Sequence, residues 1–394
     1  MEFAVSAKDA KFREDVREWL SVNVPRDPRP PITLAGAEQV EFMRRWQRKL
    51  FDGGWAGISW PEEYGGRGLS LVEQVIWYEE YARAGAPEAG CLFCSLQHAA
   101  PTLIVKGSPE QKAYYLPRIL TGEDIWCQGF SEPGAGSDLA NISTRGTVEC
   151  DYIIVNGSKI WTSFAQVSDY QELVIRTQPG SKRHKGLTWL ICDMRLPGIT
   201  IRPIKSLDGE YHNCEVFYDN VEIPVVNVVG KIDDGWSVAM ATLSFERGTA
   251  FMETQMRLAY TVEKLIGLAR LLKGADGRPI IEDGGIASQL SRLRARSASL
   301  KAMTYMGASR ARNSDMPGPE GTYIALRCGE MKQEVYRLAM EILGPQGMER
   351  PVELATQDLV QQYLYSYAAT IGGGTSEIRR NIIGERLLGL PRHG

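Results

Sequence analysis

The apolar residues of this 394-residue chain change their spacing twice along its length. From about residue 7 to 120 they recur every three or four positions, as at Val16 and Leu20, which is the period of an amphipathic helix. Between about 125 and 230 the period shortens toward two, and Gly, Asn and Pro interrupt it often, so strands are predicted. From Gly235 onward the helical period returns. This order of helices, strands and helices predicts an α+β fold.

Two local signals refine this division. Asn156-Gly157, within the run from Asp151 to Trp161, predicts a tight hairpin turn, because both residues accept positive φ. An apolar stripe from Val262 to Leu272 predicts a long helix, which the glycine-rich segment 273–279 should end.

Composition excludes several classes of protein. The 45 Lys and Arg against 48 Asp and Glu give a net charge of -3, which gives no reason to expect a nucleic-acid or anionic-membrane partner. No apolar run reaches the roughly 20 residues of a membrane span, and the mixed charges of the first twenty residues suit no secretion signal. Seven cysteines, an odd number, do not suit a disulfide framework. We therefore expect a cytoplasmic protein of three domains: helical 1–123, β 124–232 and helical 233–394.

A metal site is not predicted. Cys91 and Cys94 have the spacing of zinc ligands, with His98 nearby, but a structural zinc site needs four ligands and no second pair follows at a suitable distance. Buried thiols on a helix are the commoner explanation of such a pair. Four histidines in the whole chain also leave little room for a His-dependent mechanism.

The most informative stretch runs from Gln128 to Asp138, with the sequence QGFSEPGAGSD. Small residues beside hydroxyls let a backbone approach a ligand closely and present N–H groups to a phosphate or a flavin edge. On spacing alone, an ordinary glycine-rich loop is the more frequent explanation.

Residues 131–138 resemble the first signature of the acyl-CoA dehydrogenase family, and further segments resemble its other motifs in the same order. These are 54–68 (its N-terminal loop), 157–163 (its flavin-flanking strand) and 373–378 with the following 381–392 (its C-terminal motif). The resemblance spans essentially the whole chain. It implies a helical N-terminal domain, a β-barrel-like middle domain and a C-terminal four-helix bundle. It also implies FAD-dependent dehydrogenation of an acyl-CoA to the trans-2-enoyl-CoA, as in the β-oxidation of lipids.

The resemblance assigns site residues motif by motif. Short hydroxyls can bond the edge of a flavin and an indole can shield its face, although Trp161 taken alone is more often a core aromatic. The implied FAD contacts are Gln128, Phe130 and Ser131 along the ring and ribityl chain, Gly136 and Ser137 at the pyrophosphate, Trp161, Thr162 and Ser163 over the far side of the ring, and Thr375 and Glu377 in the C-terminal motif. The implied substrate contacts are Ser137, Ser244, Arg247, Gly373 and Gly374.

The family's reaction needs a carboxylate that takes the proton from the carbon α to the thioester while hydride passes from the β carbon to flavin N5. In the best-known members this carboxylate directly precedes the Gly-Thr of the C-terminal motif, where this chain has Gly373. The branched-chain and long-chain branches carry the base in a Glu-Arg pair, which this chain has at Glu246-Arg247. Most such pairs are solvated helical ion pairs. The complementary absence and presence favour Glu246 as base, with Glu377 as the runner-up.

Other parts of the family pattern are changed. A glycine at 373 keeps the backbone N–H that, with the flavin ribityl 2'-hydroxyl, hydrogen-bonds the thioester oxygen in the family. The segments that hold the adenine half of FAD are replaced by ones containing Arg278 and Pro345. A bacterial subclass with similar changes works as an α2β2 assembly, so we expect either a paralogous subunit or further copies of this chain in a homodimer or homotetramer. The other partners that the resemblance implies are an acyl-CoA substrate and an electron-transfer flavoprotein.

Two alternatives to an acyl-CoA dehydrogenase stay open at the level of sequence. An acyl-CoA oxidase would share the fold and pass electrons to O2, and a catalytically silent subunit would bind acyl-CoA or build the oligomer. The acyl chain is not fixed either. Small residues at Gly248, Ala250, Ala368 and Ala369 would admit a bulky, branched or steroid-derived group.

Overall fold

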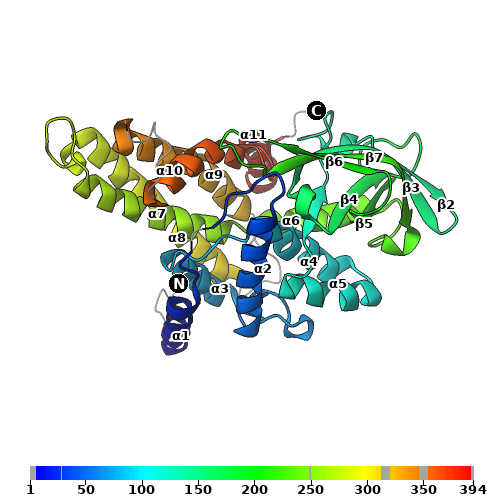
Figure 1. Ribbon diagram of the computed structural model, residues 1–394, viewed down its shortest axis with the longest axis horizontal. Coiled ribbons are helices and arrows are strands. Elements are labelled where there is room, and N and C mark those ends of the chain that lie inside the picture. The colour runs from blue at the N-terminus through cyan, green and yellow to red at the C-terminus, as the bar shows by residue number, and fades with distance from the viewer. Residues whose placement is uncertain (1–5, 28, 248–249, 312–319, 346–353, 392–394) are drawn as a thin grey trace. The chain divides into compact units, whose positions relative to one another are not determined.

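The computed structural model describes five stretches of the chain, drawn in colour in Figure 1. These stretches are residues 6–27, 29–247, 250–311, 320–345 and 354–391. For residues 245–247, 250, 308–311, 320 and 354–358 it describes the backbone alone. The chain divides into two compact units. The helical unit comprises Met1–Pro28, Leu69–Ala86 and Arg247–Gly394, and the sheet unit comprises Arg29–Gly68 and Pro87–Glu246.

The sheet unit contains a seven-stranded sheet whose strands all lie between residues 126 and 224, as the sequence predicts. Its path is β1-β4-β2-β3-β7-β6, with β5 paired to β4. Strand β1 pairs with β4 in parallel, whereas β3 pairs antiparallel with both β2 and β7 and so lies inside the sheet. The strands are β1 (Trp126–Gly129), β2 (Arg145–Glu149), β3 (Tyr152–Ser163), β4 (Tyr170–Arg176), β5 (Leu187–Asp193), β6 (Ile199–Ile204) and β7 (Asn213–Pro224).

The hairpin predicted at Asn156-Gly157 is wrong. The turn falls at Cys150 and Asp151, between β2 and β3, and Cys150 has the left-handed φ of 52°. Asn156 and Gly157 lie inside β3, at an irregularity in its pairing with β7. Gly157 has φ 144°, and a Cβ there would come within 2.8 Å of the Thr144 Cα. The glycine is needed for this close approach, which no local pattern reveals.

Helices complete the sheet unit. Two threonine hydroxyls 2.9 Å apart, Thr102 and Thr242, join α4 to α6 in the interior. The helices are α2 (Ala37–Asp52), α4 (Ala100–Lys106), α5 (Pro109–Thr121) and α6 (Gly235–Arg247), with the shorter η1 (Glu62–Tyr64), η2 (Gly90–Leu92), η3 (Ser95–Ala99), η4 (Leu139–Asn141), η5 (Ala165–Val167) and η6 (Val225–Asn227).

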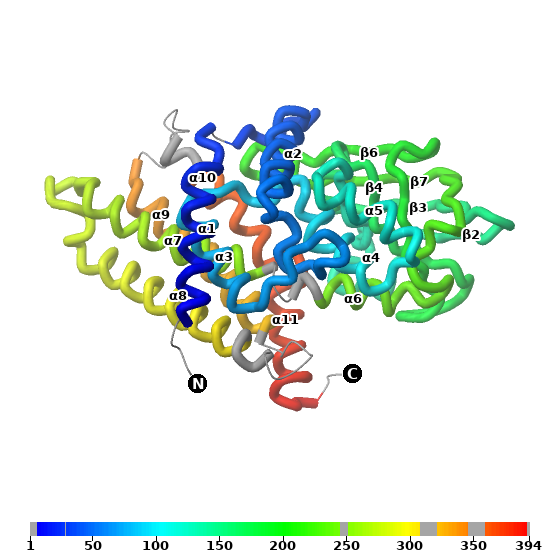
Figure 2. Tube along the Cα trace, turned by 90° about the horizontal axis from the view of Figure 1, so that it is seen from below, coloured from blue at the N-terminus to red at the C-terminus, as the bar shows by residue number. Residues whose placement is uncertain are grey.

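The helical unit has its main core between α7, α8 and α9. The predicted stripe on the long helix is confirmed, because Val262 and Leu265 are fully buried in this core. Helix α3 lies beside α1, α7 and α8 (Figure 2). The helices are α1 (Ala7–Asn23), α3 (Leu71–Arg83), α7 (Ala250–Leu271), α8 (Gly284–Ala311), α9 (Glu320–Leu343), α10 (Leu354–Tyr365) and α11 (Ser376–Ile382), with η7 (Ile280–Glu282), η9 (Ser366–Thr370) and η10 (Ile383–Leu387). Within the described stretches, no helix has the length and apolar character that crossing a membrane requires.

Candidate active site

One buried carboxylate anchors the glycine-rich loop. Glu132 accepts hydrogen bonds from Ser143 through its backbone N–H (2.6 Å) and hydroxyl (2.8 Å), from the Thr144 N–H (2.9 Å) and from Lys159 Nζ (2.8 Å). Lys159 lies on β3, is fully buried, and also donates to the Phe130 carbonyl at 3.0 Å. The loop motif and the strand motif are therefore tied together by an ion pair inside the sheet unit.

The surroundings of Glu132 keep it ionised. Burial alone would raise its pKa, but the charge and hydrogen bond of Lys159, together with the donors of Thr144 and Ser143, lower the pKa to about 2. Sequence reasoning assigned no role to either partner. The available signal was one acid and one base in two motifs expected to approach the same ligand.

Beyond this anchor the loop presents its backbone. Reciprocal 3.0 Å hydrogen bonds between the backbones of Glu132 and Ala135 close a tight turn. Gly136 and Ser137 follow the turn and are exposed, and a Cβ at Gly136 would meet no atom within 4 Å. The turn thus leaves an accessible stretch of N–H groups where the sequence predicts the pyrophosphate contact.

The end of β3 brings the predicted loop and strand residues together. The Ile160 N–H donates to the Ser131 carbonyl at 2.9 Å, which fixes the loop beside the strand. The pairing with β7 shifts between Lys159 and Thr162, and Trp161 within this shift has φ 60° and is 60 % exposed. Bulges of this kind re-aim side chains and are frequent beside active sites.

Thr162 and Ser163 supply hydroxyls next to the exposed indole. Thr162 is fully buried, and its Oγ1 has no hydrogen-bond partner among the described residues. The Ser163 hydroxyl donates to Asn213 Oδ1 at a long 3.3 Å. An exposed aromatic face beside an unsatisfied hydroxyl fits a flavin, whose ring can cover the indole and whose polar edge can bond the hydroxyl.

Gln128 is held by two buried ionisable residues. Its Nε2 lies 3.1 Å from Glu172 Oε1, to which it donates, and 3.2 Å from His98 Nδ1. The two ionisable residues lie 3.4 Å apart, and Glu172 faces Gln128 across the parallel β1–β4 pair. Sequence reasoning weighed His98 only against its chain neighbours Cys91 and Cys94, whereas a side-chain hydrogen bond joins it to the predicted flavin contact Gln128.

The C-terminal motif forms a turn that leads into α11. Thr375 is the N-cap of α11, with its hydroxyl accepting from the Ile378 N–H at 3.2 Å. Gly373 and Gly374 precede it with φ of 64° and 100°. Glu377 is exposed in the first turn, where its own backbone N–H and the Thr375 hydroxyl lower its pKa. A solvated carboxylate with a lowered pKa is a weak base, which argues against Glu377 in that role.

The proposed base lies at the end of α6. Ser244 is exposed, with its hydroxyl donating to the Ala241 carbonyl at 2.7 Å. The backbones of Glu246 and Arg247 complete the helix, and their side chains lie outside the described part of the structure. Their assigned roles therefore stay predictions.

Residues expected near the acyl chain and the adenine are only partly described. Ala368 and Ala369 lie in η9, Ala250 is described by its backbone alone, and Gly248 lies outside the described residues. Arg278 pairs with Asp276 at 2.8 Å within one surface turn. The guanidinium of Arg278 is thus paired within its own exposed turn.

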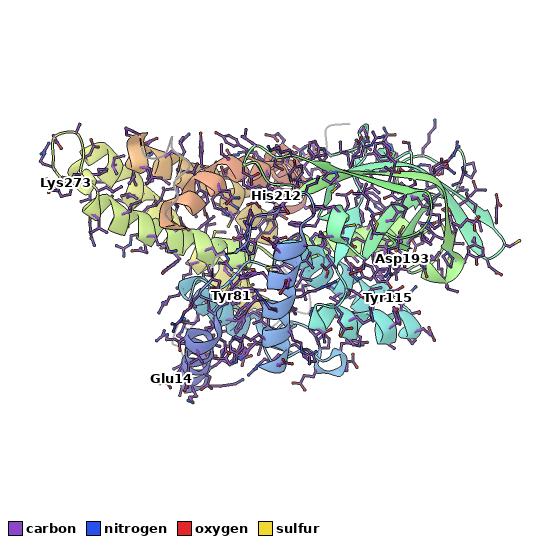
Figure 3. All side chains as sticks on the ribbon, viewed as in Figure 1. Glu14, Tyr81, Tyr115, Asp193, His212 and Lys273 are labelled. Carbon is purple, nitrogen blue, oxygen red and sulfur yellow. The ribbon has the colours of Figure 1, made fainter. Side chains whose placement is uncertain are left out.

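A second buried cluster stabilises the approach to β7. His212 Nε2 lies 2.6 Å from Asp208 Oδ2, and Glu210 accepts from the Ile32 N–H at 3.0 Å with Arg29 at 3.6 Å (Figure 3 labels His212). The three ligand-type side chains are close enough to surround a metal ion. Glu210 already has the Arg29 guanidinium as its counter-charge and accepts a hydrogen bond from the Ile32 N–H. The cluster is therefore explained by its role in fixing the segment before α2.

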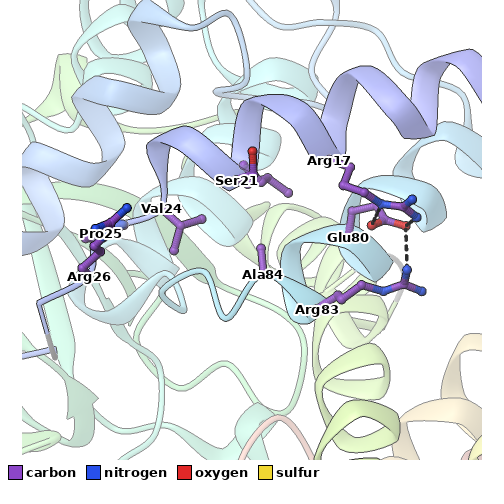
Figure 4. A pocket seen from close by; sticks show the side chains of 9 residues that line it. Arg17, Ser21, Val24, Pro25, Arg26, Glu80, Arg83 and Ala84 are labelled. Atoms are coloured by element: carbon purple, nitrogen blue, oxygen red, sulfur yellow. Dashed lines mark hydrogen bonds and ion pairs between the residues drawn. The ribbon is translucent and has the colours of Figure 1, made fainter.

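A pocket in the helical unit contains none of the predicted site residues. It lies between α1 and α3, and its carboxylate Glu80 is neutralised by Arg17 at 3.0 Å and Arg83 at 3.9 Å (Figure 4). These groups satisfy one another, so the pocket offers no evident chemistry.

Comparison with known proteins accounts for the whole chain. Models of the acyl-CoA dehydrogenase N-terminal, middle and C-terminal domains match residues 6–123, 127–221 and 233–388. The chain is 39 % identical over 387 residues to the acyl-CoA dehydrogenase IpdE1 of Mycobacterium tuberculosis, covering 97 % of this chain and 98 % of that protein.

Two solved structures have the same fold over the full length of both chains. One is the ChsE4-ChsE5 complex from Mycobacterium tuberculosis, with a TM-score of 0.85 and 31 % identity. The other is the Tcur3481-Tcur3483 steroid ACAD, with a TM-score of 0.87 and 30 % identity. Each covers 100 % of this chain and is covered by it completely.

Proposed function

Because the chain belongs to the acyl-CoA dehydrogenase family of FAD-dependent oxidoreductases acting on CH–CH bonds, we propose that it converts an acyl-CoA thioester to the trans-2-enoyl-CoA, as a cytoplasmic step of lipid β-oxidation. FAD supplies the hydride acceptor when bound. The observation that carries the proposal is the end of β3, where exposed Trp161 stands beside the unsatisfied Thr162 hydroxyl.

The FAD site is proposed on the residues of the family motifs. Glu132 and Lys159 orient the loop and the strand, while Glu172 and His98 orient Gln128. The residues proposed to contact FAD are Gln128, Phe130, Ser131, Gly136, Ser137, Trp161, Thr162, Ser163, Thr375 and Glu377. The residues proposed to contact the substrate are Ser137, Ser244, Arg247, Gly373 and Gly374. We keep the domain boundaries at 123/124 and 232/233.

We propose Glu246 as the base. Its carboxylate would take the α proton, and the electrons of the α C–H bond would form the new double bond as the β carbon gives up a hydride, for which bound FAD would supply the acceptor. The Gly373 N–H stabilises the negative charge that develops on the thioester oxygen. Support comes from the absence of a side chain at Gly373 and from the solvated, weakly basic Glu377.

The test is Glu246→Gln in FAD-loaded protein, mixed anaerobically with acyl-CoAs while flavin bleaching is followed. Loss of a general base predicts a kcat about 10²–10⁴-fold lower with FAD retained. The matched control is Glu263→Gln, which removes a carboxylate of α7 paired with Arg294 at 2.6 Å, and should bleach as the parent does. Full activity of Glu246→Gln would refute the assignment and favour Glu377, whereas a parent protein whose flavin no acyl-CoA bleaches would indicate a silent subunit.

For the substrate we propose a bulky, steroid-derived acyl group, and for the assembly an α2β2 heterotetramer with a paralogous subunit. The support is the likeness to a steroid ACAD of two named components and to the ChsE4-ChsE5 complex. We further propose an electron-transfer flavoprotein as acceptor. Full FAD occupancy and activity of the chain purified alone would contradict the heterotetramer, and peroxide release under air would indicate an oxidase.

A further inference from the structure

We propose that Arg379 is a positioning residue, which orients the Gly373 N–H for the developing oxyanion and strengthens it as a donor. The Gly372 carbonyl and the Gly373 N–H belong to one planar trans peptide unit, so they point in opposite directions. Arg379 donates to the Gly372 oxygen at 3.1 Å. The guanidinium therefore stands directly behind the proposed oxyanion donor. This inference rests on the proposed function of Gly373.

The position of Arg379 is fixed from several sides. Its second terminal nitrogen donates to the Ala325 carbonyl of α9 at 3.1 Å and to the Ala369 carbonyl of η9 at 3.4 Å. The residue is only 4 % exposed, and its guanidinium lies 5.3 Å from the centre of the Phe251 ring. The loop is thereby tied to two helices through one rigid, planar group.

Helix α9 has a glycine where this group passes. A Cβ at Gly329 would come within 2.6 Å of the Ala369 carbonyl oxygen and 3.2 Å of the Arg379 guanidinium. Only the smallest residue leaves room for the carbonyl and the cation together. Gly329 and Arg379 thus form one arrangement, contributed by segments about fifty residues apart.

The loop needs such support because its geometry is unusual. Gly373 and Gly374 both have positive φ, and glycine is the most flexible residue when nothing holds it. Among the described residues, the Gly373 N–H makes no hydrogen bond to a backbone carbonyl. A cation on the carbonyl side of a peptide draws electron density toward the oxygen and makes the N–H a stronger donor. The benefit appears as negative charge develops on a bound thioester.

The test compares Arg379→Gln and Arg379→Lys in the FAD-loaded assembly. Arg379→Gln removes the charge, while Arg379→Lys keeps it but cannot bridge three carbonyls. We expect kcat to fall about tenfold to a hundredfold in Arg379→Gln, which is a smaller loss than the loss of about 10²–10³-fold caused by deleting an oxyanion donor. KM should change by less than about threefold. The lysine variant should recover part of the loss. The matched control is Arg380→Gln. It removes the next arginine in the sequence, which is half-exposed and paired with Glu330.

A second readout does not depend on turnover. The C=O stretch of a bound, non-oxidisable 3-thiaacyl-CoA carrying ¹³C at the thioester should lie closer to its free-solution frequency in Arg379→Gln than in the parent, and in between for Arg379→Lys. If Arg379→Gln does not fold, the lysine variant is measured alone. Parent-like kcat and parent-like C=O stretch in both Arg379 variants, or in the lysine variant where that alone folds, would overturn the inference. If both Arg379 variants behave like the parent and Glu246→Gln is inactive, the inference about Arg379 is wrong but the proposed function is retained. If Glu246→Gln is active, the assignment of the base is wrong, whatever the Arg379 variants do.

Discussion

The buried Glu132–Lys159 pair should respond unequally to loss of its two members. In Lys159→Met, the Glu132 carboxylate keeps the N–H and hydroxyl of Ser143 and the N–H of Thr144. In Glu132→Gln, the fully buried Lys159 ammonium keeps the Phe130 carbonyl and loses its counter-charge. Carboxylates are well satisfied by neutral donors, whereas a buried ammonium without a counter-charge is not.

The magnitudes follow from these remaining contacts. Removing one partner of a buried ion pair costs about 3–5 kcal/mol, and Glu132→Gln should fall in this range. Three remaining donors offset part of the loss in Lys159→Met, so its cost should be about 2 kcal/mol. The double variant leaves no buried charge, which predicts a coupling of at least about 2 kcal/mol between the two sites. Lys11→Met, at an exposed helical pair with Asp15, should change stability by less than about 0.5 kcal/mol.

The assay is urea unfolding of the FAD-loaded protein, followed by near-UV circular dichroism and by flavin fluorescence. All four variants are compared at pH 7. A cost of Lys159→Met equal to or above that of Glu132→Gln would refute the reasoning, because it would mean that the three neutral donors do not satisfy the carboxylate. Coupling below about 0.5 kcal/mol would refute it equally, since the pair would then act as two independent residues.

Three further predictions follow from single residues. The pKa of Glu132 is about 2 in the folded protein against an ordinary 4.5, so its contribution to stability should be complete above pH 4.5 and be lost as pH falls toward 2. The difference in Tm between the parent and the double variant should therefore shrink over this pH range. Gly157→Ala should lower stability by about 2–3 kcal/mol in urea unfolding, because its Cβ meets the Thr144 backbone, whereas Gly180→Ala, at φ 72° in open space, should cost about 1 kcal/mol. Trp161→Ala should weaken FAD binding at least about tenfold in fluorescence titration, with apoprotein Tm unchanged, since the indole is 60 % exposed.

The fold was predictable where one period of apolar spacing continues over many residues. The stripe from Val262 to Leu272 predicts the existence of α7, because each turn of a helix repeats the same burial signal, and the glycine-rich segment after it predicts where the helix ends. The strands between residues 126 and 224 were predictable for the corresponding reason. A signal repeated over a dozen residues survives any single exception.

Features that depend on contacts between distant segments were not predictable. Asn156-Gly157 has the local chemistry of a turn, and only the approach of Thr144 makes it a bulge within a strand. The ion pair of Glu132 with Lys159 joins the loop after β1 to a residue within β3, 27 positions away in the sequence. Sequence reasoning named both motifs as ligand contacts and missed the bond between them, because neither residue type is unusual in its own segment.

The missing carboxylate at Gly373 and the conformation of this residue have a common explanation. A residue with a side chain would be strained by about 1–2 kcal/mol at the φ of 64° found there, whereas glycine is not. A chain whose base stands elsewhere is free to use this left-handed turn, and the turn brings the Gly372 carbonyl to Arg379. Loss of the side chain at position 373 is therefore compatible with an active enzyme. Proton transfer is proposed for Glu246 instead, and Gly373 still has its backbone N–H, which the buried Arg379 is proposed to orient.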